Sequence, residues 1–136
     1  MKHQLMLLML LPLAGMQPAV RIIYSCVPGV VCAGCVFYVY TVLQSFEDSN
    51  TSITLSIVLC HGLTATIAAE VDVSMPPHAT RHIYTPVVAP APGTYRLIVN
   101  ISHGGYTLDY RVYTVKAVPP PPPSWSKPTS PPLLSL

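Results

Sequence analysis

Two stretches of alternating apolar and polar residues flank a pair of glycines in the second half of the sequence, and this arrangement constrains the fold most. Between residues 94 and 101, every second side chain is large and apolar: Tyr95, Leu97, Val99 and Ile101. Residues 106–115 alternate again, with Leu108, Tyr110 and Val112 on one face and Asp109, Arg111 and Tyr113 on the other. A period of two is typical of a strand with one wet face, and Gly104-Gly105 readily adopts the positive φ of a tight turn. The sequence therefore predicts a β-hairpin.

Five further segments have the composition of strands, because they are rich in β-branched and aromatic residues. Residues 53–60 and 64–73 alternate, and their apolar faces are Ile53, Leu55, Ile57, Leu59 and Ile67, Ala69, Val71, Val73. Residues 36–43 are apolar on both faces, which is typical of a central strand buried on both sides. The second apolar face is expected to cover a neighbouring element, to enclose a ligand or to lie exposed as an adhesive patch. Shorter strands are expected at 22–25 and 81–87. The total of about seven strands at regular spacing predicts a single all-β antiparallel sandwich.

The N-terminus has the pattern of a secretory signal peptide. A single positive charge at Lys2 precedes the apolar run 5–11, and Pro12 and the small Ala14 and Gly15 follow it. We assign residues 1–19 to the signal peptide, with cleavage near Gly15 or, alternatively, Ala19. The apolar run is too short to span a bilayer by itself. We therefore expect a secreted, extracellular protein.

Four cysteines, Cys26, Cys32, Cys35 and Cys60, follow the signal peptide. An even number in a short exported chain predicts two disulfides and no free thiol. We expect Cys60 to pair with one of the three clustered cysteines and the other two to pair with each other. The C-x-x-C at residues 32–35 has no basic neighbour to lower a thiol pKa and no second ligand pair, so it favours a structural disulfide over redox or zinc chemistry.

The sequence changes character after Val118. Five consecutive prolines begin at Pro119, and further prolines follow among Ser and Thr. Such a composition favours extended polyproline II and has no core to join. We therefore place the folded domain at residues 20–118 and a disordered, proline-rich tail at 119–136, which in an exported protein is typical of a stalk.

A small multi-pass membrane protein is a rival interpretation. Residues 22–46 and 52–69 contain no charged side chain and are long enough for membrane helices. Pro28, Gly29 and Gly34 interrupt the first segment, and His61-Gly62 lies within the second. These features favour strands over lipid-facing helices, so membrane association is not the preferred expectation.

Two sequons of the form N-x-[ST] lie at Asn50 and Asn100. The motif permits N-glycosylation only in an exported protein. Asn50 lies in the polar stretch 45–52, and Asn100 lies on the wet face of a predicted strand. We expect both sites to be accessible and favour occupancy at Asn50, because a strand end can be shielded.

Enzyme chemistry is not indicated. The sequence contains no G-x-S-x-G, H-E-x-x-H or phosphate-binding glycine loop. His78 and His82 have the spacing of a helical metal pair, but they follow Pro76-Pro77 in a region without helix signals. Charged residues make up 9% of the chain and the net charge is +2, which gives no basic patch for nucleic acid. We expect no catalytic residues, no metal and no cofactor.

The segment Ala91-Pro92-Gly93-Thr94-Tyr95-Arg96-Leu97 and the hairpin after it resemble the last two strands of immunoglobulin-like sandwiches. In that family a P-G-x-Y opening leads into the penultimate strand, and a proline-rich stalk often follows. The resemblance extends to ectodomains of viral and cell-surface glycoproteins and covers about a quarter of the chain. It departs from the family pattern in two ways, because the only tryptophan, Trp125, lies in the tail and no cysteine follows Cys60.

Secreted lipid-binding sandwiches of the ML type are similar in outline, since they also place P-x-G-x-Y before a late strand. That resemblance implies a lipid held between two sheets, although the late cysteines of that family are absent here.

The preferred prediction is a binding module that recognises an extracellular or cell-surface protein. Eight tyrosines support it, because tyrosine offers a large, rigid contact area with a polar tip. Within the final hairpin we expect Tyr106 and Tyr113 to contact the partner. Lipid carriage in an apolar cavity is the alternative.

Overall fold

The computed structural model describes residues 19–122, which form eight strands and no helix. The strands are β1 (Val20–Cys26), β2 (Val30–Cys32), β3 (Val36–Ser45), β4 (Thr51–His61), β5 (Thr64–Met75), β6 (Thr80–Val88), β7 (Gly93–His103) and β8 (Tyr106–Val118). Residues 1–18 of the predicted signal peptide and residues 123–136 of the predicted tail lie outside the described part. Pro119–Pro122 follow β8 without regular structure and are exposed.

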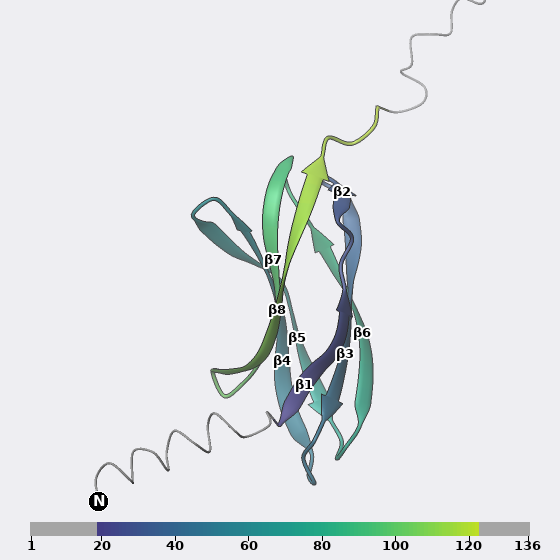
Figure 1. Ribbon diagram of the computed structural model, residues 1–136, viewed down its shortest axis with the longest axis vertical. Helices are drawn as coiled ribbons and strands as arrows, with labels where there is room; N and C mark the ends of the chain where they lie inside the picture. The colour runs from purple at the N-terminus through teal and green to yellow at the C-terminus, as the bar shows by residue number, and fades with distance from the viewer. Residues whose placement is uncertain (1–18, 123–136) are drawn as a thin grey trace, which may run out of the picture.

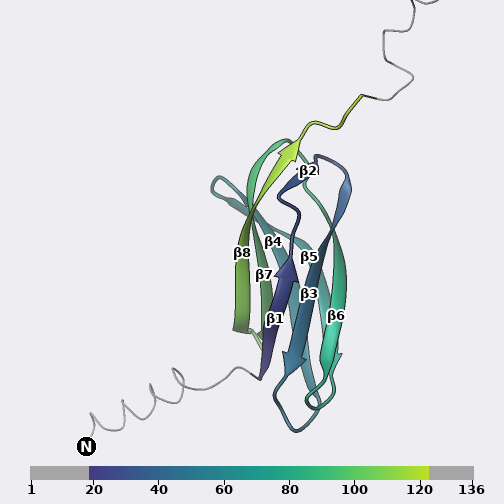
Figure 2. The same cartoon turned by 45° about the vertical axis from the view of Figure 1, so that its right-hand side comes forward.

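The strands form two sheets that pack face to face, as Figures 1 and 2 show. One sheet has three strands in the order β1-β3-β6, and the other has five in the order β2-β8-β7-β4-β5. All pairings are antiparallel except that of β2 with β8, which is parallel. The predicted all-β sandwich is confirmed. The sequence interpretation missed β2, because three residues are too few to show a period.

The predicted hairpin is present as β7 and β8. His103 pairs with Tyr106, and Gly104 and Gly105 between them have φ values of 58° and 85°. Two consecutive residues with positive φ make a type I′ turn, whose twist matches that of the flanking strands. A side chain at either position would be strained, so glycine is required here.

The core lies between the sheets and is built from the inward faces of the longest strands. The predicted faces of β4 and β7 are confirmed, since all eight side chains are at most 5% exposed: Ile53, Leu55, Ile57, Leu59, Tyr95, Leu97, Val99 and Ile101. Phe37, Val39 and Leu43 of β3 and Val20 and Ile22 of β1 cover them from the other sheet. Burial of this apolar surface is the main stabilising contribution to the fold.

Of the alternatives for residues 36–43, the structure shows a central strand with one exposed face. They form β3 of the three-stranded sheet, with β1 on one side and β6 on the other. Burial on both faces is wrong, because no other strand of residues 19–122 covers the outer face of this sheet. Val36 and Tyr38 point outward and are more than half exposed.

Three β-bulges interrupt strands that the sequence suggested were regular, and each bulge changes which face of the sheet the neighbouring residues occupy. The extra residues are Ile23 in β1, Ala68 in β5 and Leu108 in β8. The bulge at Ala68 moves Ile67 to the outer face, where it is 61% exposed. The predicted common face of Ile67 with Ala69, Val71 and Val73 is therefore wrong at Ile67.

The topology is compatible with an immunoglobulin-like sandwich. In that fold the strand corresponding to β5 belongs to one sheet in some members and to the other sheet in others. Here β5 pairs with β4 and therefore extends the sheet that contains β4, β7 and β8. The Tyr95 hydroxyl, at the start of β7, donates to the Ala91 carbonyl (2.7 Å) and accepts from the Ala91 N–H (3.2 Å). A tyrosine that bonds backbone a few residues upstream of the penultimate strand is the tyrosine corner of this fold class.

Replacing Tyr95 with phenylalanine is expected to lower the free energy of unfolding by about 1 kcal/mol, because both bonds to Ala91 are lost while the buried ring stays. Chemical denaturation of the two proteins measures this difference. Tyr110→Phe is the matched control, since Tyr110 lies on the outer face of β8 and is 58% exposed. Equal stability of the Tyr95 variant and the native chain would show that the corner contributes nothing.

The alternative of two membrane helices is wrong, because residues 22–46 and 52–69 form strands β1 to β5. Within residues 19–122, no helix has the length and apolar character needed to cross a bilayer.

Candidate functional site

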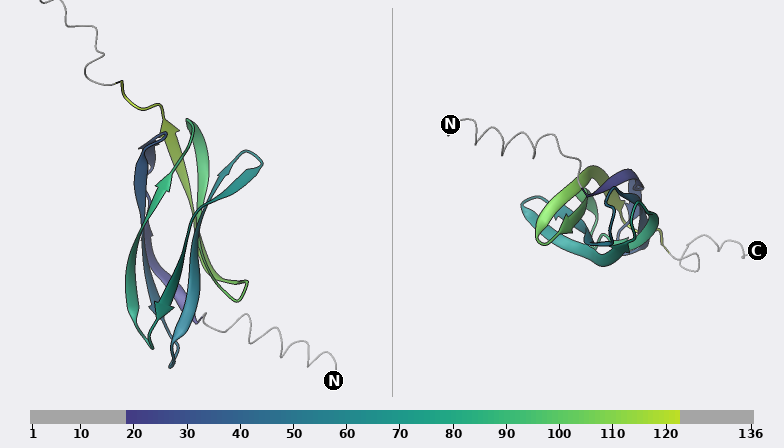
Figure 3. Two further views of the ribbon diagram at one scale, coloured as in Figure 1. Left: turned by 180° about the vertical axis from the view of Figure 1, so that it is seen from behind. Right: turned by 90° about the horizontal axis from the view of Figure 1, so that it is seen from below.

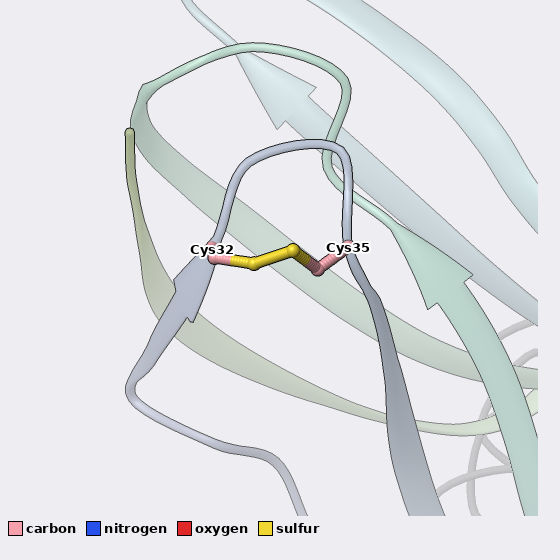
Figure 4. The surroundings of a disulfide bond; sticks show 2 residues. All are labelled: Cys32 and Cys35. Carbon is pink, nitrogen blue, oxygen red and sulfur yellow. A yellow bond between two sulfur atoms is a disulfide. The ribbon is translucent and has the colours of Figure 1, made fainter. Parts of the chain in front are cut away.

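The four cysteines form one disulfide, Cys32–Cys35, which closes the turn between β2 and β3 (Figure 4). Cys26 and Cys60 are free thiols. The expected second disulfide with Cys60 is therefore absent. The reason is topological: Cys26 pairs with Tyr40 on the outer face of the three-stranded sheet, whereas Cys60 follows inward-facing Leu59 and points out of the other sheet.

Alkylation of the denatured, unreduced chain is expected to modify two thiols, Cys26 and Cys60, and mass spectrometry counts them. Prior reduction is expected to raise the count to four. Removing the Cys32–Cys35 disulfide is expected to lower the free energy of unfolding by about 2 kcal/mol, since the short loop that it closes restricts the unfolded chain only modestly. A count of zero before reduction would restore the two-disulfide interpretation.

The two tyrosines predicted to bind a partner lie in different surroundings. Tyr106 is 78% exposed at the tip of the β7–β8 hairpin. Tyr113 is half-buried, contacts the Ser25 hydroxyl, and donates to the Ser25 carbonyl (3.3 Å). Tyr113 therefore joins β8 to β1, so the structure assigns it a role between the sheets. It is a poor candidate for a free binding surface.

The same seam between β1 and β8 contains an ion pair. Nη1 of Arg111 and Oδ1 of Asp109 lie 2.9 Å apart. The Asp109 carboxylate accepts the N–H of Ile22 (2.9 Å), and Arg111 donates to the Ile22 carbonyl (2.7 Å). Together they satisfy the backbone of β1 next to its bulge at Ile23, where no neighbouring strand does so. The carboxylate of Asp109 and the guanidinium of Arg111 thus bond each other and the backbone of β1, so we assign this cluster a structural role.

A different set of tyrosines forms an exposed surface. The outer face of the β1-β3-β6 sheet presents Tyr24, Tyr38, Tyr40 and Tyr84, half of the tyrosines in the chain, with Val36 and Val88 beside them. We call this surface the tyrosine face. Tyr24, Tyr38, Tyr84 and Val36 are each more than half exposed. Neighbouring exposed aromatic and aliphatic side chains of this kind mark interaction surfaces on folded domains.

The rings of the tyrosine face hold one another in place. Tyr40 stacks on Tyr84 with centroids 4.7 Å apart, and Tyr24 meets its edge at 5.8 Å. The Tyr40 hydroxyl bonds Nδ1 of His82 (2.7 Å). The electrostatic interaction with the adjacent Cys26, and the hydrogen bond to it, raise the pKa of the Tyr24 hydroxyl. Three of the four rings, those of Tyr24, Tyr40 and Tyr84, are thus held in mutual contact.

Sequence reasoning allowed an exposed apolar face on residues 36–43 but did not single out its tyrosines, although a signal was present. Tyr38 and Tyr40 are two residues apart in a predicted strand, and Tyr84 lies in another. The partner-binding tyrosines were instead sought in the final hairpin.

An apolar groove of about 440 Å³ lies at one end of the sandwich. The β4–β5 hairpin diverges from the body of the molecule there (Figures 1 and 3). Side chains from β4, β5 and β7 and the β6–β7 connection line it, among them Leu59, Ala68, Pro90 and Tyr95. The His61 ring packs on Tyr95, with centroids 4.9 Å apart. The groove is an open feature of the surface, whereas the core between the sheets is filled.

The remaining predicted positions are separate from these surfaces. Asn50 is exposed in the β3–β4 connection, and Asn100 is half-buried in the middle of β7. These exposures agree in direction with preferred glycan occupancy at Asn50, which stays a prediction. His78 hydrogen-bonds the Asp48 carboxylate (2.7 Å), whereas His82 bonds the Tyr40 hydroxyl on the tyrosine face. In the described part of the chain, no three His, Cys, Asp or Glu side chains gather as a metal site would need.

Fold and surfaces together define the class: an all-β sandwich, compatible with the immunoglobulin-like fold, with an exposed aromatic sheet. No protein-family model and no curated protein sequence matches the chain.

Solved structures match the fold. The CARDB domain of the PF1109 protein from Pyrococcus furiosus, crystallised in complex with di-metal ions, has a TM-score of 0.56 at 13% identity, over 75% of this chain and 93% of that domain. A β-glucosidase from Listeria innocua has a TM-score of 0.57 at 11% identity. A β-glucuronidase from Bacteroides uniformis has a TM-score of 0.56 at 11% identity. The chain covers only 15% of each glycosidase. At these identities the likeness shows the fold alone.

Proposed function

We propose that the protein is an exported binding module that recognises an extracellular or cell-surface protein through the tyrosine face. The observation that carries this proposal is the uncovered aromatic sheet of Tyr24, Tyr38, Tyr40 and Tyr84. A strand with apolar residues on both faces normally lies between two layers, yet β3 has one. A partner that covers the outer face would remove this apolar surface from water.

Tyrosine chemistry suits protein recognition better than catalysis. Each exposed ring brings a large contact area while fixing only two side-chain torsions, and its hydroxyl can pair with backbone groups of a partner. The strands β1, β3 and β6 contain no Asp or Glu. A partner therefore meets no carboxylate that it would have to desolvate on these strands. The predicted signal peptide and sequons are consistent with an extracellular partner.

Replacing Tyr38 and Tyr84 with serine is expected to abolish capture of a partner from intact cell surfaces, a loss of at least about tenfold, since buried tyrosines are frequent hot spots. Binding of labelled protein to cells measures the effect. Tyr106→Ser is the control, because Tyr106 is even more exposed than Tyr38 and Tyr84 but lies next to the β7–β8 turn. Unchanged binding by the Tyr38/Tyr84 variant, with the Tyr106 variant impaired, would return the site to the final hairpin.

The groove at the end of the sandwich favours a second function, binding of a small apolar ligand such as a lipid chain. Its volume falls within the range of small-molecule sites, and its walls are largely apolar. Native mass spectrometry of the secreted protein tests this alternative. Stoichiometric lipid that Ala68→Arg displaces, together with no binding to cells, would favour the carrier function over the proposed one.

A further inference from the structure

The chain itself contains a segment with the chemistry that an aromatic sheet face recognises. Pro119–Pro123 are consecutive prolines, and Pro128, Pro131 and Pro132 follow. A proline offers a carbonyl acceptor but has no N–H donor. In polyproline II the carbonyls make no internal hydrogen bonds and stay available. Such segments bind in aromatic-lined grooves, where rings pack on prolines and side-chain donors meet the carbonyls.

The tyrosine face supplies the complementary groups. Tyr38 and Tyr84 are 57% and 64% exposed, and their hydroxyls can donate to carbonyls. Tyr40 lies between Tyr24 and Tyr84, whose rings contact it at 5.8 and 4.7 Å, and so supports the Tyr84 ring. No carboxylate lies on β1, β3 or β6, whose charged side chains are Arg21 and Arg81, and Lys127 is the only charged side chain of residues 119–136. An acceptor-rich ligand without acidic side chains therefore meets donors on this surface and no carboxylate that would have to be desolvated.

The path of the chain after β8 decides which copy supplies that ligand. The Val118 carbonyl accepts the N–H of Ala33 (2.8 Å), which fixes the end of β8 beside the β2–β3 turn. From there Pro119–Pro122 are exposed and lead away from the sandwich, as Figures 1 and 2 show. A run of consecutive prolines is semi-rigid and extends about 3 Å per residue. The described part of this run, Pro119–Pro122, therefore points away from the sheets of its own chain.

We propose that the tyrosine face of one copy binds the proline-rich segment 119–136 of a second copy. The lengths agree: the eight residues from Val36 to Leu43 extend about 26 Å along β3, and nine residues of polyproline II span about 28 Å. The 18 residues of the segment suffice for a spacer and a ligand of that length. This inference uses the same face as the proposed function but requires no other protein.

Sedimentation velocity of the purified chain, including residues 119–136, tests the proposal over about 10 µM to about 1 mM, the range of weak, small interfaces. The native chain is expected to associate as its concentration rises. The Tyr38→Ser/Tyr84→Ser variant and a Pro120→Ser/Pro122→Ser variant are each expected to weaken the association at least about fivefold. Tyr106→Ser is expected to associate as the native chain does. Trp125, the only tryptophan, reports on the segment through quenching by acrylamide.

Each other outcome overturns the proposal in a distinct way. A chain that stays monomeric up to the highest concentration has no such contact. Association that the tyrosine variant loses but the proline variant keeps would mean that two tyrosine faces pair directly. Protection of Trp125 at every concentration, lost in the tyrosine variant, would mean that each face holds its own tail. Because no second protein is present, these results are independent of whether cells carry a partner.

Discussion

Replacing Leu97 with alanine is expected to lower the free energy of unfolding by about 3 kcal/mol, the largest effect of any single substitution considered. Leu97 has no exposed surface and lies in β7, which pairs with β4 on one side and β8 on the other. Truncation removes three buried carbon atoms and leaves a cavity that two paired neighbours prevent from collapsing. For a domain of this size the melting temperature should fall by on the order of 10–20 °C.

Ile98→Ala is the matched control for this experiment. Ile98 is the next residue in the same strand, but it points to the outer face and is only half-buried. Its truncation is expected to cost about 1 kcal/mol or less, since it opens no enclosed cavity. Urea denaturation of both variants measures the difference. Equal losses would show that the interior of the sandwich is not the main source of stability.

Much of this fold could be predicted because the central strands alternate without interruption. In β4 and β7 every second residue is large and apolar, and each of these residues is buried. The glycine pair between β7 and β8 permits one tight turn, which fixed the hairpin. Where local periodicity and tertiary packing agree, the sequence is sufficient.

The phase errors arise at bulges, which periodicity cannot detect. Leu108 and Ala68 each add one unpaired residue, so the alternation changes face within the strand. In β8 the outer face then receives Tyr110 and Val112, both exposed, and the inner side receives Asp109 and Arg111. Hydrophobicity alone gives the opposite assignment. The polar pair is inside because it satisfies the backbone of a strand 87 positions away in sequence.

The cysteine prediction failed for a related reason. An even count of cysteines predicts pairing only if the fold brings them together, and Cys26 and Cys60 lie on outer faces of different sheets. The tyrosines of β3 were not singled out, because composition shows that residues 36–43 have a second apolar face but not what covers it. That residues 36–43 are uniformly apolar is a property of the chain, but the layer that covers them need not belong to the same chain.

Replacing Asp109 with alanine is expected to cost about 2–3 kcal/mol, second only to the loss of Leu97. The Asp109 carboxylate accepts from the N–H of Ile22 and from Arg111, both at 2.9 Å, and its side chain is 20% exposed. Hydrogen bonds to a charged group are stronger than neutral ones, and removal of the acceptor leaves the Ile22 N–H unpaired at the seam. β1 should therefore detach from β8 more readily than the core unfolds.

Two further variants separate the backbone bond from the ion pair. Asp109→Asn keeps one oxygen for the Ile22 N–H and loses the second oxygen, which accepts from half-exposed Arg111 and from the Tyr110 N–H. Because these two bonds lie on the exposed side of the carboxylate, a loss of about 1 kcal/mol is expected. Asp72→Ala is the surface control, because Asp72 is exposed and accepts a hydrogen bond from the Thr54 hydroxyl (2.9 Å). Hydrogen exchange of the Ile22 N–H reports on opening of the seam between β1 and β8. The denaturation midpoint reports on the stability of the whole domain. If Asp109→Ala costs no more than Asp72→Ala, the side chains at the seam follow the packing of the two sheets and do not stabilise it.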